Sequence, residues 1–221
     1  MSRLSSAEAP PDSDTREQIF LAAERLFAER GFDGVSVRDI VAEAGCNIAA
    51  INYHFGAKSE LLLEIFRRRT RELNKERQRL LREASAAGAP GLLDILHALL
   101  APPILWRDPA SGHAIASRFV SRALSEATPQ LRRILETDVS HQKPFLAALK
   151  AALPDWDEPE LCWALHFAGG VAHQCNDSNF KRVRVLSGGA CDTENLPAVL
   201  DRALRFALGG LAAMAAKAPA P

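Results

Sequence analysis

Apolar side chains recur at helical spacing along almost the whole chain, and this periodicity most constrains what the chain can fold into. In residues 14–30 they fall at i, i+4, i+7 and i+8, so they share one helical face. Those side chains are Ile19, Ala23, Leu26 and Phe27. The sequence has no strand-like alternation of useful length, and its hydrophobic content of 48% suits a globular core. The sequence therefore predicts an all-α fold.

Glycine, proline and capping residues divide this pattern into separate helices. A capping pattern that begins at Asp14 starts the first helix, and Gly31 ends it. Further along, prolines such as Pro102 and Pro103 mark helix edges. The expected helices are 14–30, 37–44, 47–55, about 58–86, 91–101, 112–125, 128–152, 157–186 with a possible break, and 196–214.

The same pattern predicts two helical units between two flexible ends. Residues 1–13 and 215–221 carry little to bury and are typical of flexible arms. A small unit over 14–75 leads through the long helix into a larger helical domain over 76–214. An Ala- and Gly-rich stretch at 86–91 breaks the chain after that helix.

Residues 36–55 contain two short amphipathic helices joined by a tight glycine turn. Ser36 begins a capping pattern, the first helix ends at Gly45, and Asn47 is a good N-cap for the second helix. This is the spacing of a helix-turn-helix, whose second helix lies in the DNA major groove. The same geometry also serves plain packing of short helices, so spacing alone leaves both interpretations open.

A helical wheel predicts which side of the second helix faces outward. We expect Ile48, Ile51 and Phe55 to point inward. Two alanines on the other side would allow a close approach to base edges, and a tyrosine and a histidine suit phosphate oxygens. The outward residues are Ala49, Ala50, Tyr53 and His54.

Three further polar residues flank this face. Asn47 could cap the helix or bond an adenine edge, and Asn52 falls toward the inner flank. Lys58 starts the next helix, where its charge and the free amides could hold a phosphate.

The run TREQIFLAAERLFAERGFDGVSVRDIVAEAGCNIAAINYHFGAKSELLLEIF resembles the N-terminal domain of the TetR/AcrR family of bacterial transcriptional regulators. The resemblance covers about residues 15–75 and includes LFAERGF, AG at the turn and YHF at the end of the third helix. It implies a ligand-responsive repressor that binds DNA and is not an enzyme. The DNA contacts that we expect are Ser36, Val37, Arg38, Asn47, Ile48, Ala49, Ala50, Asn52, Tyr53, His54 and Lys58.

Two positions depart from the family pattern. Asn52 stands where an aromatic residue is frequent, and Ala57 stands where a serine often caps the fourth helix. These departures are the only hints toward an interaction protein that has lost DNA binding.

Basic residues gather on the long helix between Arg67 and Arg82. They could face DNA phosphates or simply form a solvated face. A helix rises 1.5 Å per residue, which places Arg82 about 36 Å from Lys58, so we favour the solvated face for the far end.

The segment from SRFVSRALSEATPQLRRILE to LSGGACD is similar to the C-terminal domain of a subgroup with fatty-acid-responsive regulators of the PsrA type. Leu124, Phe145 and Leu165 are among its apolar side chains, and an arginine pair four residues apart could receive an anionic head group. We therefore expect an acyl or other apolar anionic effector. The candidate ligand-binding residues are Trp106, Arg118, Phe119, Arg122, Trp163, His166 and Phe167.

Paired glycines inside two helices predict close helix–helix approach, because a glycine there costs about 0.5–1 kcal/mol relative to alanine. In the family, the last two helices form a four-helix dimer interface. A recognition helix that covers one half-site also favours a two-fold homodimer on a palindromic operator. The candidate interface residues are Gly169, Gly170, His173, Leu208, Gly209 and Gly210.

Cys162, His166 and His173 share one helical face, which raises the alternatives of a metal site or an enzyme. The two histidines lie two turns apart, about 10 Å along the axis, which argues against a compact site. The sequence has no nucleophile elbow and no phosphate-cradling glycine loop. We therefore expect no metal, no cofactor and no catalytic residue.

Charge and composition say little about DNA. The chain has 27 Lys and Arg against 27 Asp and Glu, and residues 1–84 are balanced as well. Affinity for DNA should therefore depend on a few placed contacts and on dimerisation. The sequence has neither a membrane-spanning apolar run nor a secretory signal, and its four cysteines form no CxxC pair, which predicts a cytoplasmic protein.

Overall fold

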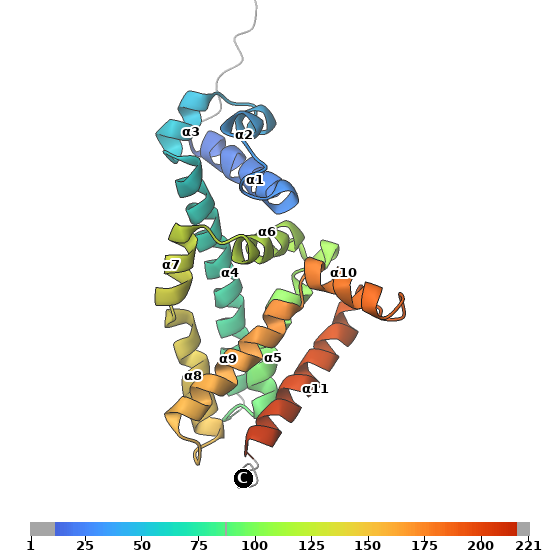
Figure 1. Cartoon of the computed structure of the whole chain (residues 1–221). Helices are drawn as coiled ribbons and strands as arrows, with labels where there is room; N and C mark the ends of the chain where they lie inside the picture. The colour runs from blue at the N-terminus through green and yellow to red at the C-terminus, as the bar shows by residue number, and fades with distance from the viewer. Residues whose placement is uncertain (1–11, 87, 216–221) are drawn as a thin grey trace, which may run out of the picture.

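The computed structural model describes residues 12–86 and 88–215, and these residues form eleven α-helices and two 3-10 helices (Figure 1). The 3-10 helices are η1 (Pro109–Ser111) and η2 (Ser140–Gln142). The all-α prediction is confirmed. The α-helices are α1 (Asp12–Arg30), α2 (Val37–Ala44), α3 (Ile48–His54), α4 (Lys58–Ala86), α5 (Leu92–Leu105), α6 (Ala114–Ser125), α7 (Pro129–Thr137), α8 (Lys143–Ala152), α9 (Glu158–Gln174), α10 (Asp177–Leu186) and α11 (Leu196–Ala215).

The helices form a small unit at one end of the molecule and a larger bundle at the other. In Figure 1, α1, α2 and α3 gather at the top, and α4 runs from them down into the bundle of α5, α8, α9 and α11. Helix α6 lies across the junction and packs against α1. Among the described residues, no helix combines the length and apolarity that crossing a membrane would require.

Two hydrophobic cores follow this division, and α4 contributes to both. One core joins α1, α2, α3 and the first turns of α4, up to Phe66. The other joins α5, α8, α9 and α11 with Leu81 near the far end of α4. Phe119, Ala123 and Leu131, from α6 and α7, are buried in the first core. Helices α6 and α7, which belong to the larger domain, therefore complete the core of the small unit.

The first helix starts earlier than its sequence predicts. Helix α1 begins at Asp12, so Asp14 lies inside it and is not its N-cap, and residues 12–13 are helical instead of part of an arm. Residues 1–11 and 216–221 of the two expected arms lie outside the described residues, and Ala215 is the last residue of α11. Gly31 ends α1 as expected, with a φ of +80° and its N–H donating to the Phe27 carbonyl at 3.0 Å.

Pro102 and Pro103 lie inside α5 and do not mark its end, because the helix continues to Leu105. A proline offers no N–H to the carbonyl four residues before it, so Pro103 leaves the Leu99 carbonyl without its usual donor. The Arg77 side chain fills this gap, since its Nε donates to the Leu99 oxygen at 2.9 Å. A contact from α4 therefore allows α5 to run past its prolines.

Two expected helices are each divided. The predicted helix 128–152 is split into α7 and α8 around η2, where Asp138 accepts hydrogen bonds from the N–H and the hydroxyl of Ser140 at 3.2 and 2.6 Å. The predicted helix 157–186 breaks between α9 and α10, as its sequence allowed. Asn176 makes this second break by capping α10, and its Oδ1 accepts from the Asn179 N–H at 3.0 Å.

Candidate DNA-binding surface and internal cavity

Helix α2 has the start and the end that its sequence predicts. The Asp39 N–H donates to Ser36 Oγ at 3.2 Å, and the Ser36 N–H donates to Asp39 Oδ2 at 2.7 Å, which completes a capping box. The Ser36 hydroxyl also donates to the Asp39 carboxylate, and this hydrogen bond, followed by that of the Ser36 N–H, lowers the pKa of Asp39. Gly45 ends the helix in the left-handed region with a φ of +66°. This fixed eight-residue helix sets the direction in which the chain enters α3.

Asn47 caps α3, and this answers one question that its sequence left open. Its Oδ1 accepts a hydrogen bond from the Ala50 N–H at 3.0 Å. The side-chain oxygen thus uses one of its two lone pairs to cap the helix, and the second lone pair and the amide nitrogen would remain for a base or a phosphate.

The outward face of α3 differs from the predicted one. Ile51 is fully buried and Phe55 nearly so, as expected, but Ile48 is 45% exposed and Ala50 packs partly against the core. The small Ala50 fits against the core, so the helix turns toward that side and carries the larger Ile48 outward. The prediction that Ile48 points inward and Ala50 outward is therefore wrong.

This rotation brings Asn52 onto the exposed side instead of the inner flank. Tyr53 is 76% exposed, while His54 is half-buried with its ring 4.9 Å from the tyrosine ring in an edge-on arrangement. The exposed side chains of α3, which we call the α3 face, are Ile48, Ala49, Asn52 and Tyr53.

The predicted contacts on α2 have mixed environments. Ser36 and Arg38 are exposed beside α3, whereas Val37 is half-buried and packs on the core. Ser36 and Arg38 are therefore accessible to a phosphate, and Val37 serves mainly to hold α2 in place.

Lys58 is occupied by the protein itself. Its Nζ donates to the carbonyl oxygens of Phe32 and Val35, each at 2.7 Å, and lies 4.0 Å from the centre of the Phe32 ring. The ammonium group thus ties the turn between α1 and α2 to the start of α4. An ammonium has three donors, so at most one is left for the phosphate contact that the sequence suggests.

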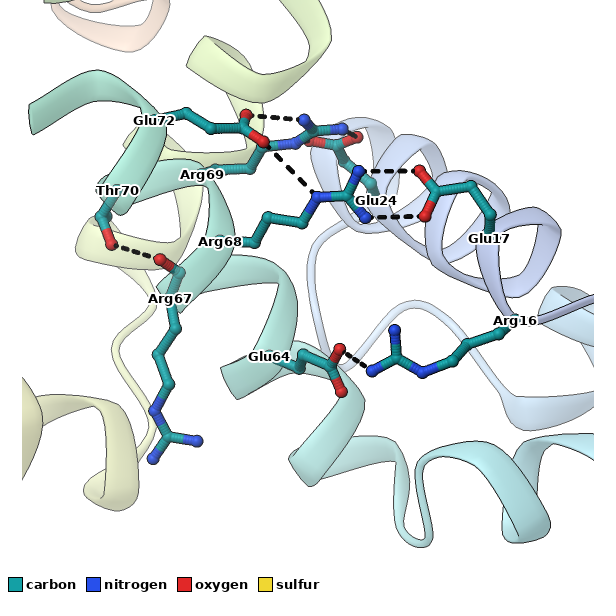
Figure 2. Close-up of polar contacts among 9 residues, drawn as sticks. All are labelled: Arg16, Glu17, Glu24, Glu64, Arg67, Arg68, Arg69, Thr70 and Glu72. Carbon is teal, nitrogen blue, oxygen red and sulfur yellow. Dashed lines mark hydrogen bonds and ion pairs between the residues drawn. The ribbon is translucent and has the colours of Figure 1, made fainter. Parts of the chain in front are cut away.

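The arginines at the near end of α4 bind α1 (Figure 2). Arg68 donates to both carboxylate oxygens of Glu17 at 2.7 and 2.9 Å. Arg69 does the same with Glu24 at 2.5 and 2.6 Å, and both partners of this second pair are largely buried. In Figure 2 the Arg67 side chain points away from these pairs.

Farther along α4, Arg79 pairs with Glu76 and Glu83. Arg68, Arg69 and Arg79 therefore form helix-to-helix and solvated ion pairs, which favours the solvated interpretation for these three arginines. Arg77 differs from them, because it turns toward the interior of the larger unit.

A cavity of about 720 Å³ lies between α4, α5, α6, α7 and α9. This volume falls in the range of small-molecule sites, about 300–1,000 Å³. Its apolar wall includes Phe66, Leu73, Trp106, Leu124, Phe145 and Leu165. Its polar wall includes Asn74, Arg77, Arg118, His141, His166 and Asp177.

Of the seven ligand-binding candidates, Trp106, Arg118 and His166 line this cavity. Phe119 is instead buried in the core of the small unit, with its ring 6.4 Å from the Phe27 ring. Arg122 donates a hydrogen bond of 3.2 Å to Glu126 beside the small unit.

Two more candidates lie on the outer surface. Trp163 and Phe167 are both more than half exposed, and their rings stack 5.4 Å apart. The expectation that Arg118 and Arg122 receive one head group together is corrected, because Arg118 faces Asp177 at 3.6 Å while Arg122 faces Glu126.

Two polar groups of the cavity were missed by sequence reasoning. The sequence pattern places Arg77 in the basic run of the long helix, and it gives no sign that His141 lines a cavity. Burial lowers the pKa of the Arg77 guanidinium to about 10. Burial, and then the positive charge of Arg77, lower the pKa of His141. At neutral pH the arginine is therefore charged and the histidine neutral. A proline four residues after Leu99 was the one sequence signal that could have pointed to Arg77.

The glycine pairs of α9 and α11 do not serve close packing inside one chain. A Cβ at Gly169, Gly170, Gly209 or Gly210 would meet no atom within 4 Å. The same two helices expose Trp163, Phe167 and Phe206. Gly169, Gly170 and His173 also line the cavity. The role of this surface as a dimer interface, with His173 and Leu208, stays a prediction.

Cys162, His166 and His173 are all exposed on α9. Within the described part of the chain, no group of three or more His, Cys, Asp or Glu side chains is placed to hold a metal ion.

Two family models match the chain and together cover most of it. The model of the bacterial regulatory proteins of the tetR family matches residues 19–65, which contain α2, α3 and the start of α4. The model of the tetracyclin repressor-like C-terminal domain matches residues 97–210. Both describe regulatory proteins, and neither describes an enzyme.

Curated relatives agree with the family models. The HTH-type transcriptional repressor AcnR of Corynebacterium glutamicum is 29% identical over 100 residues, 45% of this chain and 48% of AcnR. The chain thus matches about half the length of this relative.

Solved structures show the same fold over most of the chain. The superantigen PfiT has a TM-score of 0.62 at 19% identity, and the match covers 90% of this chain and 97% of PfiT. A TetR/AcrR-type transcriptional regulator from Aquifex aeolicus has a TM-score of 0.56 at 22% identity, and the match covers 89% of this chain and 99% of that one. With its two halves matching the two halves of one family, the chain belongs to the tetR family of bacterial regulatory proteins.

Proposed function

We propose that the protein is a transcriptional repressor that binds DNA sequence-specifically through the α3 face. The observation that carries this proposal is the α3 face itself. A short helix, capped at its start and backed by a buried core, presents Ile48, Ala49, Asn52 and Tyr53 to solvent. The small alanine permits a close approach to base edges, Asn52 can pair with an adenine, and the tyrosine hydroxyl can reach a phosphate. Ser36 and Arg38 would add phosphate contacts from α2.

The repressor acts as a homodimer on a palindromic operator. Helix α3 has seven residues, so one chain contacts a single half-site, and two-fold symmetry doubles the contact. The α9 and α11 surface, with its open glycines and exposed aromatic rings, is the favoured interface. A nearly neutral chain gains little from general attraction to phosphates, which makes this doubling more important.

A small-molecule effector in the cavity regulates DNA binding through α6. One side of α6 lines the cavity through Arg118 and Leu124, and another packs on α1 through Phe119. Suppose that the effector binds the protein more tightly when α6 is in one position than when it is in another. Binding would then move α6, and with it the small unit relative to its half-site.

The remaining assignments follow from this role. The DNA-binding unit extends over residues 14–75 and the effector and dimer unit over 76–214, a boundary supported by the change of core along α4 between Phe66 and Leu81. The protein works in the cytoplasm, where its operator lies.

Selection from a random DNA library tests the proposal and identifies the operator at the same time. The full chain should enrich a palindromic sequence, and fluorescence anisotropy at fixed salt should give tight binding to it. The double variant A49E/Y53A should lose most of this affinity, because it places a charge and a gap on the α3 face. Leu93→Ala, at an exposed position on α5, is the matched control and should bind as the wild type does. Failure to enrich any sequence, or full affinity in the double variant, would contradict the proposal.

A further inference from the structure

Four basic side chains form a line along the outside of α4. With about 3.6 residues per turn, they fall within an arc of about 80° and cover about 22 Å of the helix axis. Each of them is exposed, and the half-buried Gln78 that shares their arc carries no charge. These four residues, which we call the α4 stripe, are Arg67, Arg71, Lys75 and Arg82.

The α4 stripe differs from the paired arginines of the same helix. Arg68, Arg69 and Arg79 bind glutamates of α1 and α4. Within residues 12–86 and 88–215, by contrast, no side chain of the stripe forms a hydrogen bond or an ion pair. Figure 2 shows one member, Arg67, pointing away from the pairs around it. The charges of the stripe are therefore available to an anion from outside the chain.

The surroundings of the stripe indicate which kind of anion it fits. All large apolar side chains that the described residues expose lie outside α4. A protein interface normally has an apolar or aromatic centre, whereas a nucleic-acid backbone is held mainly by Arg and Lys contacts with phosphate oxygens. The stripe offers only the second kind of contact, so it matches a nucleic-acid backbone better than an acidic protein.

The spacing of the stripe suits a row of phosphates. Arg67, Arg71 and Lys75 follow one another at about 6 Å along the helix axis. One DNA strand carries a phosphate about every 3.4 Å of its axis, so a strand that follows the stripe passes about six phosphates. Each cation can therefore reach a different phosphate, and the guanidinium forks of the arginines match two phosphate oxygens at once.

Helix α4 carries the stripe away from the α3 face. Along the helix axis, Arg67 lies about 14 Å and Arg82 about 36 Å from Lys58. In Figure 1, α4 runs from the small unit down into the larger bundle. Neighbouring half-sites lie about 34–36 Å apart, so the far end of the stripe is as distant from the small unit as one half-site is from the next. The stripe therefore needs a segment of DNA other than the half-site under α3.

We propose that the α4 stripe binds the phosphate backbone of duplex DNA without reading its sequence, at a segment distinct from the half-site on the α3 face. This activity goes beyond sequence-specific repression, because it lets one protein hold two segments of DNA together. The neutral charge of the whole chain does not reveal it, since the stripe concentrates positive charge on one face of one helix.

The salt dependence of binding to a labelled duplex of arbitrary sequence tests the proposal. The measurement uses the full chain with the double variant A49E/Y53A, so that the α3 face contributes little. The logarithm of the affinity should fall with the logarithm of the salt concentration with a slope of about −0.9 for each phosphate neutralised, about −3.6 for four. The added changes R67Q/R71Q/K75Q/R82Q should remove about 3–4 units of this slope and weaken binding at low salt about 10-fold or more.

Two control variants separate placement from charge. The changes R132Q/R133Q/K181Q/R182Q remove the same charge from exposed positions on α7 and α10, and they should leave most of the slope in place. The changes R67K/R71K/R82K keep the charge of the stripe and should keep the slope, because counterion release depends on charge. Circular dichroism confirms that each variant is folded.

An unchanged slope in the stripe variant, or an equal loss in the α7 and α10 control, would overturn the proposal. Preference for poly-L-glutamate over the duplex would also overturn it, in favour of an acidic protein partner. Wild type saturated with its selected operator should still bind the labelled duplex, and competition between the two would contradict a separate segment. If no operator is enriched, the proposed function fails, and the salt titration still decides the role of the stripe.

Discussion

The carboxylate of Glu126, at the end of α6, accepts a hydrogen bond of 3.2 Å from the backbone N–H of Phe32 in the turn between α1 and α2. This contact joins the wall of the cavity to the small helical unit, because α6 lines the cavity with another of its sides. Gly31 permits the approach, since a Cβ there would lie 2.6 Å from Glu126 Oε2.

Gly31→Ala should lower the free energy of unfolding by about 1–3 kcal/mol. The position has a φ of +80°, which strains any residue with a Cβ, and the added methyl group would also push Glu126 away. Urea unfolding followed by circular dichroism measures the loss. Gly112→Ala has a φ of +73° with nothing within 4 Å, so it shares the strain and lacks the clash. A loss in Gly31→Ala no larger than in this control would show that the contact with Glu126 tolerates a side chain.

Glu24→Gln should destabilise the protein by about 3–5 kcal/mol. Glu24 is 4% exposed at its side chain and Arg69 is 14% exposed, so removing one charge leaves the other buried without its main partner. Glu83→Gln removes an exposed partner of Arg79 and should change stability far less, because solvent screens this pair. If urea unfolding shows the same loss of stability in both variants, the Arg69–Glu24 pair is exposed to water in solution, which contradicts the prediction.

The ion pair between Glu17 and Arg68 should make the free energy of unfolding fall as the solution becomes acidic. The hydrogen bonds from Arg68 hold the pKa of Glu17 below its ordinary value of 4.5 in the folded state. A lowered folded-state pKa stabilises the protein above the unfolded value, and this stabilisation is lost as the pH falls through the folded value. The stability difference between wild type and Glu17→Gln should therefore be largest near neutrality and shrink below about pH 4. Urea unfolding across pH 3–7 checks this, and a difference that is constant with pH would contradict it.

The rotation of α3 buries Ile51 and exposes Ile48. Ile51→Ala should cost about 2–5 kcal/mol of stability because the side chain is fully buried, whereas Ile48→Ala, at 45% exposure, should cost less than about 1 kcal/mol. Ile48→Ala should instead weaken operator binding. A large stability loss in Ile48→Ala would restore the orientation that its sequence pattern suggests.

Local sequence signals predict much of this fold, and tertiary contacts determine the rest. The ends of α2 and the cap of α3 follow from Ser36, Gly45 and Asn47, whose effects act within a few residues. The orientation of α3 does not, because a seven-residue helix has few apolar positions and the fit of Ala50 against the core decides its rotation. The role of Arg77 could not be predicted either, since it depends on a carbonyl 22 residues away.

The central claim is that two copies of α3 dock in the major groove, and purine methylation interference on the selected operator tests it most directly. Methylation of guanine N7 changes the major groove, and methylation of adenine N3 changes the minor groove. We predict interference at guanine N7 in two symmetric groups, separated by about 10–10.5 base pairs or a multiple of that spacing. Interference confined to adenine N3, or a single group without a symmetric partner, would contradict the claim.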